Sequence, residues 1–248
     1  MCEFSVKIIL TDIEGTTTSI SFVKDTLFPF AKEHTERYLQ GTCETLETQN
    51  IIKDLKNLSQ YEEFLKETNT TPAKEVDIKV LSQFVNYLID KDLKLGPLKT
   101  LQGYVWAEGY KSGNIKGHVY ADVPGAFKLW HEAGVRLAIY SSGSIKAQQL
   151  LFGQTELGNL LPYITAHFDT TSGHKQEKQS YINIAQSLKV DPHDILFLTD
   201  IVKEAEAARL AGYQTAILSR PGNGPLTDDD KSQFTIINDF ESLKIKAK

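Results

Sequence analysis

The residues from Ile8 to Thr17 constrain the fold of this chain more than any other stretch. Branched apolar residues run directly into Asp12, Glu14 and Gly15. A run this short and this apolar is typical of a strand that is buried on both faces. Buried charge is expensive, so we expect the strand to end where the carboxylates begin. Two neighbouring acids repel each other unless a cation binds them or one stays protonated. The alternative interpretation is a strand-end turn with two solvated acids.

Strand and helix patterns alternate along the second half of the chain. Short apolar runs that predict strands are separated by amphipathic helical patterns, and they cover residues 135–140, 166–169, 194–200, 213–218 and 234–237. Such alternation predicts a parallel sheet with helices on both faces. The strand that begins at Ile8 belongs to the same pattern.

A long helical stretch separates that first strand from the others. From Phe22 to about Lys94 the sequence is polar and helical in period, and a further helix is expected over 98–111. We therefore predict an α/β core, doubly wound around a parallel sheet, that is built from residues 1–18 and 116–248. An all-helical cap domain is expected over residues 19–115.

Composition and charge exclude several classes of protein. A net charge of −5 in 248 residues argues against a protein that grips nucleic acid through its overall field. No segment approaches membrane-spanning length, and no basic leader precedes the first apolar run. Cys2 and Cys43 form neither a disulfide framework nor a metal pattern, which favours a reducing compartment. We expect a cytoplasmic monomer without nucleic-acid or membrane partners, and we keep a nuclear presence as an alternative.

Polar residues gather where the predicted strands end, and open parallel sheets bind ligands beyond these carboxyl ends. The hydroxyls and backbone N–H groups of Ser141 and Ser142 precede a helix, which suits a phosphate. Lys175 would neutralise phosphate charge. Asp200 and Asp12, with Glu14 as a further candidate, would hold magnesium, a hard cation that takes oxygen ligands.

Four segments resemble, in order, the motifs of the haloacid dehalogenase superfamily: Asp12 to Thr16, Ser141 to Gly143, Lys175, and Leu198 to Asp200. Glu14 stands where the superfamily usually has Asp. A wider set of segments (DIEGTT, SFVKDTLFP, YSSGS, LLFG and HFDT) is similar to the enolase-phosphatase (acireductone synthase) family of methionine salvage over nearly the whole chain. In that family, with magnesium, 2,3-diketo-5-methylthiopentyl-1-phosphate is enolised and dephosphorylated to 1,2-dihydroxy-3-keto-5-methylthiopentene.

The resemblance implies a role for each site residue. Asp12 is the expected nucleophile and forms an aspartyl-phosphate. Glu14 is the expected general acid and base, touches the magnesium shell, and is our first candidate for the enolisation base. Asp200 completes the magnesium site.

The remaining site residues are expected to bind the substrate. Ser141, Ser142 and Lys175 hold the transferring phosphoryl group or the diketone oxygens, and Lys175 also offsets charge in the transition state. The cap is expected to exclude water and to take up the methylthio tail.

Two alternatives stay open at this point. A generic small-molecule phosphatase of the same superfamily would share the nucleophile and the metal site. A non-catalytic module that only holds a divalent ion or a ligand would keep the fold, but it would not need a nucleophile opposite a phosphate site.

Overall fold

The computed structural model describes residues 2–71 and 76–248 and divides into two compact units. The first unit combines the chain up to Val23 with the chain from Lys116 to Lys248, and the second is Lys24–Ile115. We predicted the first boundary between residues 18 and 19, and the predicted cap includes residues 72–75, which lie outside the described residues. We call the two units the sheet unit and the helical unit.

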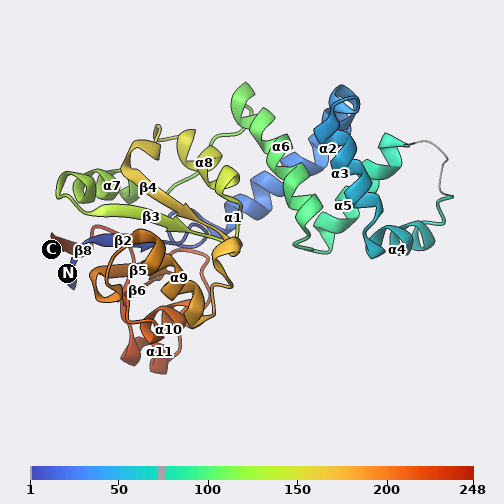
Figure 1. Cartoon of the computed structure of the whole chain (residues 1–248). Helices are drawn as coiled ribbons and strands as arrows, with labels where there is room; N and C mark the ends of the chain where they lie inside the picture. The colour runs from blue at the N-terminus through green and yellow to red at the C-terminus, as the bar shows by residue number, and fades with distance from the viewer. Residues whose placement is uncertain (1, 72–75) are drawn as a thin grey trace. The chain divides into compact units, whose positions relative to one another are not determined.

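A six-stranded parallel sheet forms the centre of the sheet unit (Figure 1). The strand order is β4-β3-β2-β5-β6-β7. The strands are β2 (Ile8–Thr11), β3 (Arg136–Tyr140), β4 (Ile164–Phe168), β5 (Ile195–Thr199), β6 (Gln214–Leu218) and β7 (Thr235–Ile237). Strand β2 lies between β3 and β5, with Leu10 opposite Ala138 and Phe197. Every residue of β2 is buried, which confirms the strand expected from the apolar run.

Helices cover both faces of this sheet, as the alternating pattern predicted. In Figure 1, α7 (Asp122–Glu132) and α8 (Ile145–Gly153) lie on one side, and α9 (Lys178–Leu188) and α10 (Val202–Leu210) lie on the other. Helix α11 (Asp228–Gln233) begins with a capping box between Thr227 and Asp230, so the acidic run there has a structural role. The sheet unit also contains short 3-10 helices at Leu161–Tyr163, Thr170–Ser172 and Pro192–Asp194.

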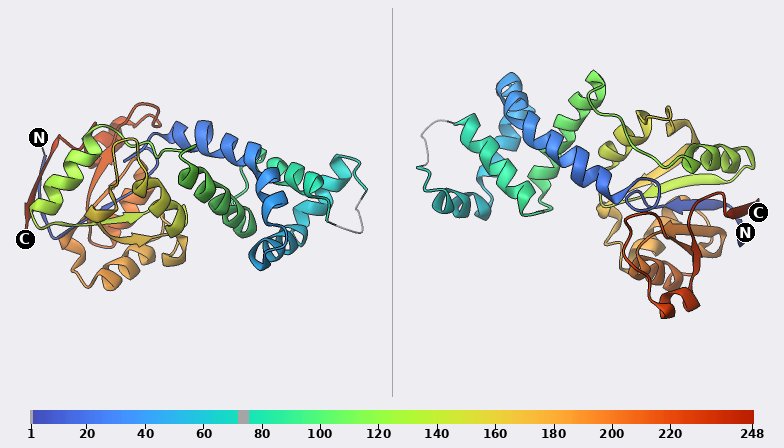
Figure 2. Two further views of the ribbon diagram at one scale, coloured as in Figure 1. Left: turned by 90° about the horizontal axis from the view of Figure 1, so that it is seen from above. Right: turned by 180° about the vertical axis from the view of Figure 1, so that it is seen from behind.

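The two ends of the chain pair with each other. Strand β1 (Cys2–Val6) runs parallel to β8 (Leu243–Ala247) in a separate two-stranded sheet, with Cys2 opposite Leu243 and Val6 opposite Ala247 (Figure 2). Glu3 forms ion pairs with Lys244, at 3.2 Å, and with Lys246. These strands were not predicted, although the alternation of apolar and polar residues in both segments is typical of half-exposed strands.

The segments where the chain leaves and re-enters the sheet unit are hydrogen-bonded to each other. The backbone N–H of Tyr120 donates to the carbonyl of Thr17 at 3.0 Å. The Nδ1 atom of His118 accepts from the backbone N–H of Ser19 at 3.3 Å and lies 2.9 Å from the Thr18 hydroxyl. The base of the insertion is therefore closed within the sheet unit itself.

The helical unit is a bundle around an aromatic core. After α1 (Ile20–Phe22) and a π-helical turn at Val23–Leu27, its helices are α2 (Phe28–Thr42), α3 (Leu46–Lys56), α4 (Ser59–Glu67), α5 (Ile78–Asp90) and α6 (Gly96–Ser112). Phe84 on α5 is fully buried and contacts the rings of Tyr61 and Phe64. A side chain at Gly109 on α6 would collide with the ring of Phe30 on α2, so this glycine lets α6 pack closely against α2. None of the described helices has both the length and the apolar character that crossing a bilayer requires.

Candidate active site

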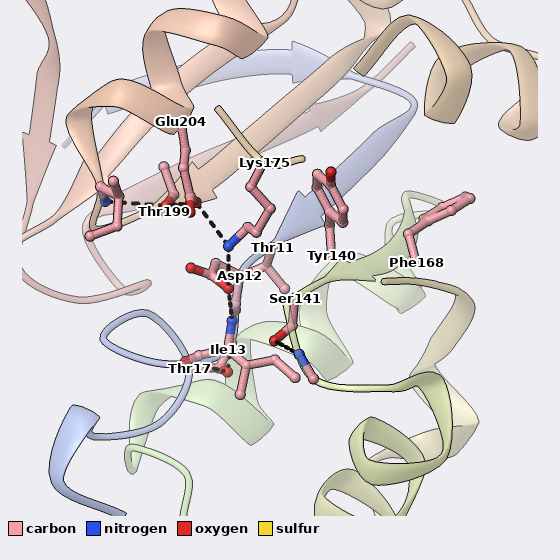
Figure 3. Close-up of polar contacts among 12 residues, drawn as sticks. Thr11, Asp12, Ile13, Thr17, Tyr140, Ser141, Phe168, Lys175, Thr199 and Glu204 are labelled. Atoms are coloured by element: carbon pink, nitrogen blue, oxygen red, sulfur yellow. Dashed lines mark hydrogen bonds and ion pairs between the residues drawn. The ribbon is translucent and has the colours of Figure 1, made fainter. Parts of the chain in front are cut away.

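A buried lysine joins two carboxylates at the carboxyl edge of the sheet. The Nζ atom of Lys175 lies 2.8 Å from Oδ1 of Asp12 and 2.8 Å from Oε2 of Glu204 (Figure 3). Asp12 directly follows β2, and Glu204 lies in the first turn of α10. The three side chains are at most 10% exposed. Removing one partner of a buried ion pair is strongly destabilising, because it leaves an uncompensated buried charge.

The electrostatics of the three groups follow from burial and from this contact. Burial disfavours the Lys175 ammonium, but attraction by Asp12 and Glu204 outweighs burial and raises the pKa of the lysine. Burial and the neighbouring charge of Asp12 raise the pKa of Glu204, while the bonds from Lys175 and Thr199 oppose that rise. Lys175 therefore stays charged at neutral pH.

The backbone around Lys175 is fixed by two tyrosines. The hydroxyl of Tyr181 on α9 donates to the carbonyl of Lys175 at 2.6 Å. The hydroxyl of Tyr140, at the end of β3, donates to the carbonyl of Gly173 at 3.0 Å. Both rings are fully buried. The lysine thus reaches Asp12 from a segment that the core holds in place.

A tight loop follows Asp12 and turns the chain away from the sheet. The carbonyl of Ile13 accepts from the backbone N–H groups of Thr17 and Thr18, each at 2.9 Å. The Ile13 N–H donates to Oδ1 of Asp12 at 2.7 Å, so the backbone also orients the carboxylate. Strand β2 ends at Thr11, so Asp12 and Glu14 lie in the loop and need not point to the same side as they would along a strand. Glu14 is exposed, whereas Asp12 is only 5% exposed.

Asp200 reaches the same loop from the neighbouring strand. It follows β5, and its carboxylate lies so close to Gly15 that a Cβ there would overlap an Asp200 oxygen. Gly15 also has a positive φ of 73°, which favours glycine. Burial and the charge of Asp12 raise the pKa of Asp200 to about 7. The structure therefore brings Asp12, Asp200 and Lys175 into one neighbourhood.

The turn after β3 lies at the same edge of the sheet. Ser141 is buried, and its N–H donates to the carbonyl of Phe168 at 3.2 Å. Its Oγ accepts from the N–H of Gly143 at 3.2 Å (Figure 3). Ser142 is exposed. The hydroxyl of Ser144 caps α8 by accepting from the Ala147 N–H at 3.3 Å. The helix start expected after this turn is confirmed.

The residues at this edge fit a magnesium ion. Asp12 and Glu204 both contact Lys175. Burial and the charge of Asp12 raise the pKa of both Asp200 and Glu204, and a bound cation would relieve the repulsion. Within residues 2–71 and 76–248, no three His, Cys, Asp or Glu side chains are grouped to hold a metal. Magnesium needs no such cage, because it binds through one or two carboxylates together with water and substrate phosphate oxygens. Asp12 and Asp200 supply that smaller set.

Three residues that contact Lys175 or the loop after β2 were not predicted from the sequence: Glu204, Asn223 and Arg220. Glu204 follows the acid-terminated strand β5 by about one helical turn, and this spacing is the only sequence signal of its place at the site. Asn223 donates to the carbonyls of Gly15 and Leu218, at 2.9 and 3.0 Å. Arg220, which is buried, donates to the Thr16 carbonyl at 3.2 Å. Nothing in the local sequence distinguishes the last two from surface-loop residues.

Comparisons with known proteins agree with this geometry. The model of the haloacid dehalogenase-like hydrolases matches residues 6–212. The enolase-phosphatase E1 of Drosophila ananassae is 59% identical over 96% of this chain and 94% of its own length. That of Drosophila melanogaster is 55% identical over 96% of this chain and 92% of its own length.

Solved structures agree at the level of the whole chain. The crystal structure of the UTR4 protein of Saccharomyces cerevisiae has a TM-score of 0.78 and 37% identity, and the match covers 96% of this chain and 100% of that one. CbbY of Rhodobacter sphaeroides in complex with phosphate has a TM-score of 0.56 at 14% identity, with 96% of each chain covered, and so supports the fold alone.

Proposed function

Because this chain belongs to the haloacid dehalogenase-like hydrolases and, within them, to the enolase-phosphatase E1 family, we propose that it is the acireductone synthase of methionine salvage. Its substrate would be 2,3-diketo-5-methylthiopentyl-1-phosphate, and its products the acireductone 1,2-dihydroxy-3-keto-5-methylthiopentene and phosphate. The observation that carries the proposal is the buried contact of Asp12 with Lys175 beside Asp200, at the edge of a parallel sheet.

Phosphoryl transfer would begin at Asp12. Its carboxylate attacks phosphorus in line, the bond from phosphorus to the substrate oxygen breaks, and an aspartyl-phosphate forms. Glu14 protonates the leaving oxygen and then removes a proton from the water that hydrolyses the intermediate. Lys175 stays positively charged throughout, because its pKa is raised. Its contact with Asp12 would place this charge close to the reacting phosphoryl oxygens.

The other site residues would bind and orient the substrate. The hydroxyls of Ser141 and Ser142, together with the N–H of Ser144 in the same turn, hold the phosphoryl group or the diketone oxygens. Asp12 and Asp200, with Glu14 at the edge of the site, would hold magnesium, which when bound offsets phosphoryl charge. Glu14 remains our candidate for the enolisation base.

The proposal also covers where and how the protein works. We expect a cytoplasmic monomer, with a nuclear presence as the alternative, and a small phosphorylated diketone as its ligand. The residue ranges 1–18 and 116–248 for the catalytic core and 19–115 for the cap remain predictions, as does the selection of substrate by the cap.

Turnover of the diketone phosphate tests the activity directly. Purified protein with magnesium should release phosphate and produce the absorbance of the acireductone, and Asp12→Asn protein serves as the control. Turnover of common sugar phosphates without the diketone would indicate a generic phosphatase. A protein that binds magnesium but neither turns over phosphates nor traps beryllofluoride at Asp12 would be a binding module.

A further inference from the structure

Gln148 is a fully buried polar side chain that the proposed reaction does not use. It lies on α8, one turn after the phosphate-binding turn formed by residues 141–144, and is 1% exposed. Its Nε2 donates to the carbonyl of Gly143 at 2.9 Å and to that of Phe168 at 2.8 Å. One amide group therefore ties the turn to the end of β4.

The orientation of this amide is fixed by its partners. Only the NH₂ end of Gln148 can satisfy two carbonyls, so Oε1 must face the opposite side. There Oε1 lies 3.0 Å from Nδ1 of His167, which must then carry the hydrogen and donate it. Burial lowers the pKa of His167, which favours the neutral ring. His167 thus prevents the amide from reversing.

The hold on Gly143 determines which way the next N–H group points. A trans peptide unit is planar, so its C=O and N–H point in opposite directions. Because the Gly143 carbonyl points to Gln148, the N–H of Ser144 points away from the interior. The N–H of Gly143 is held by Ser141 Oγ at the same time. The direction of the Ser144 N–H is therefore set by a side chain behind the turn, whereas the Gly143 N–H is engaged within the turn.

We propose that Gln148 is the positioning residue of the phosphate-binding turn: it holds the peptide unit between Gly143 and Ser144 so that the N–H of Ser144 is presented to a phosphate. It acts through the backbone and does not touch the substrate. The inference rests on the proposed function, since it assumes that this turn binds the phosphoryl group.

Gln148→Glu provides the sharpest test, because a carboxylate has the same shape but cannot donate to the two carbonyls. The neighbouring Gln149 is exposed, and Gln149→Glu is the matched control with the same change in charge. The probe is inorganic phosphate with magnesium, followed by calorimetry and as a competitive inhibitor. We expect Gln148→Glu to weaken phosphate binding about tenfold and to raise KM similarly, with a smaller change in kcat, while Gln149→Glu matches wild type.

Each outcome decides the matter. Equal phosphate affinity in the Gln148 and Gln149 variants would overturn the inference, as would a loss of kcat in proportion to misfolded protein with KM unchanged. If the Glu variant does not fold, Gln148→Met removes both donors without adding charge, and the same tenfold weakening is expected. Wild-type protein that binds no phosphate and turns over no diketone phosphate would instead contradict the proposed function.

Discussion

The sheet unit and the helical unit treat charge in opposite ways. Among the described residues, the acidic and basic side chains that are buried (Asp12, Lys175, Glu204 and Arg220) all belong to the sheet unit. In the helical unit the buried polar side chains are neutral, and its ion pairs, such as that of Lys32 with Asp90, lie at the surface.

Burial therefore serves a different purpose in each unit: it provides stability in the helical unit and positions charged groups in the sheet unit. Aromatic and aliphatic burial stabilises the helical unit without requiring exact partners. The sheet unit instead buries charged side chains, which are better solvated in water, so each of them depends on a partner of opposite charge or on hydrogen bonds. Charge of this kind is retained at functional sites, where perturbed pKa values concentrate. The five tests that follow can break or sharpen this comparison.

The largest effect is expected from Asp12→Asn. The amide cannot attack phosphorus, so phosphate release should fall by at least about 10³-fold, as when a covalent nucleophile is removed. The circular dichroism spectrum should not change, because Lys175 keeps Glu204 as its partner at 2.8 Å. A phosphate-release assay measures the loss, and activity near wild type would refute the role given to Asp12.

Phe84→Ala should destabilise the helical unit. Phe84 is fully buried among other aromatic rings, and a cavity of that size costs about 3–5 kcal/mol. Denaturant unfolding followed by tryptophan fluorescence can report the loss, since Trp106 lies in the helical unit and its Nε1 donates to the Leu27 carbonyl at 2.8 Å. A loss below that of a surface substitution such as Leu46→Ala would mean that the aromatic core is not what stabilises this unit.

Lys175→Met contrasts with Lys32→Met. Removing Lys175 leaves two buried carboxylates without a cation, so we expect a loss on the order of 3 kcal/mol in unfolding free energy. Removing Lys32 breaks a 2.6 Å surface pair with Asp90 and should cost below about 1 kcal/mol. Urea unfolding of both variants gives the comparison, and equal losses would contradict the view that buried charge distinguishes the sheet unit.

Magnesium should stabilise the protein through the sheet unit. A ligand present at about 100 times its Kd adds about 2.7 kcal/mol to the folded state. A chelator should therefore lower the melting temperature, and Asp200→Asn should abolish the difference. Calorimetric titration with magnesium alone reports the binding without any substrate. Unchanged magnesium binding in Asp200→Asn would place the metal elsewhere.

The smallest effect concerns pH. Burial lowers the pKa of His167 below its ordinary value of 6.5. Its contribution to stability is therefore complete above about pH 6.5 and is lost as the pH falls through the lower pKa of the folded state. The slope from this one group cannot exceed about 1.4 kcal/mol per pH unit. Thermal unfolding measured at roughly half-unit steps between pH 7 and pH 5 gives the melting temperature as a function of pH. We expect the melting temperature to fall less with decreasing pH in His167→Asn than in wild type. Identical curves would refute this contribution.

Sequence patterns predicted the sheet because buried parallel strands are nearly continuous apolar runs, and β2, β3 and β5 are of that kind. They also predicted the residues that follow those strands, since an acid or a serine after an apolar run is conspicuous. Asp12, Ser141 and Asp200 were found in this way, and the roles given to them remain predictions.

The supporting residues could not be found in this way. Gln148, Asn223 and Arg220 act on carbonyls of other segments, and their partners are set by the tertiary fold and not by any local period. The terminal strands β1 and β8 were missed for a related reason: each is half exposed and has a single partner strand, the other end of the chain.

The closed base of the insertion has a consequence for how such chains diversify. Because Thr17 and Tyr120 are bonded to each other, as are the residues beside them, the sheet unit presents two adjoining attachment points that do not depend on what lies between them. Ninety or so residues could be exchanged for a different module while the catalytic groups keep their anchorage. New substrates could then be acquired by replacing a cassette, without rebuilding the reaction centre.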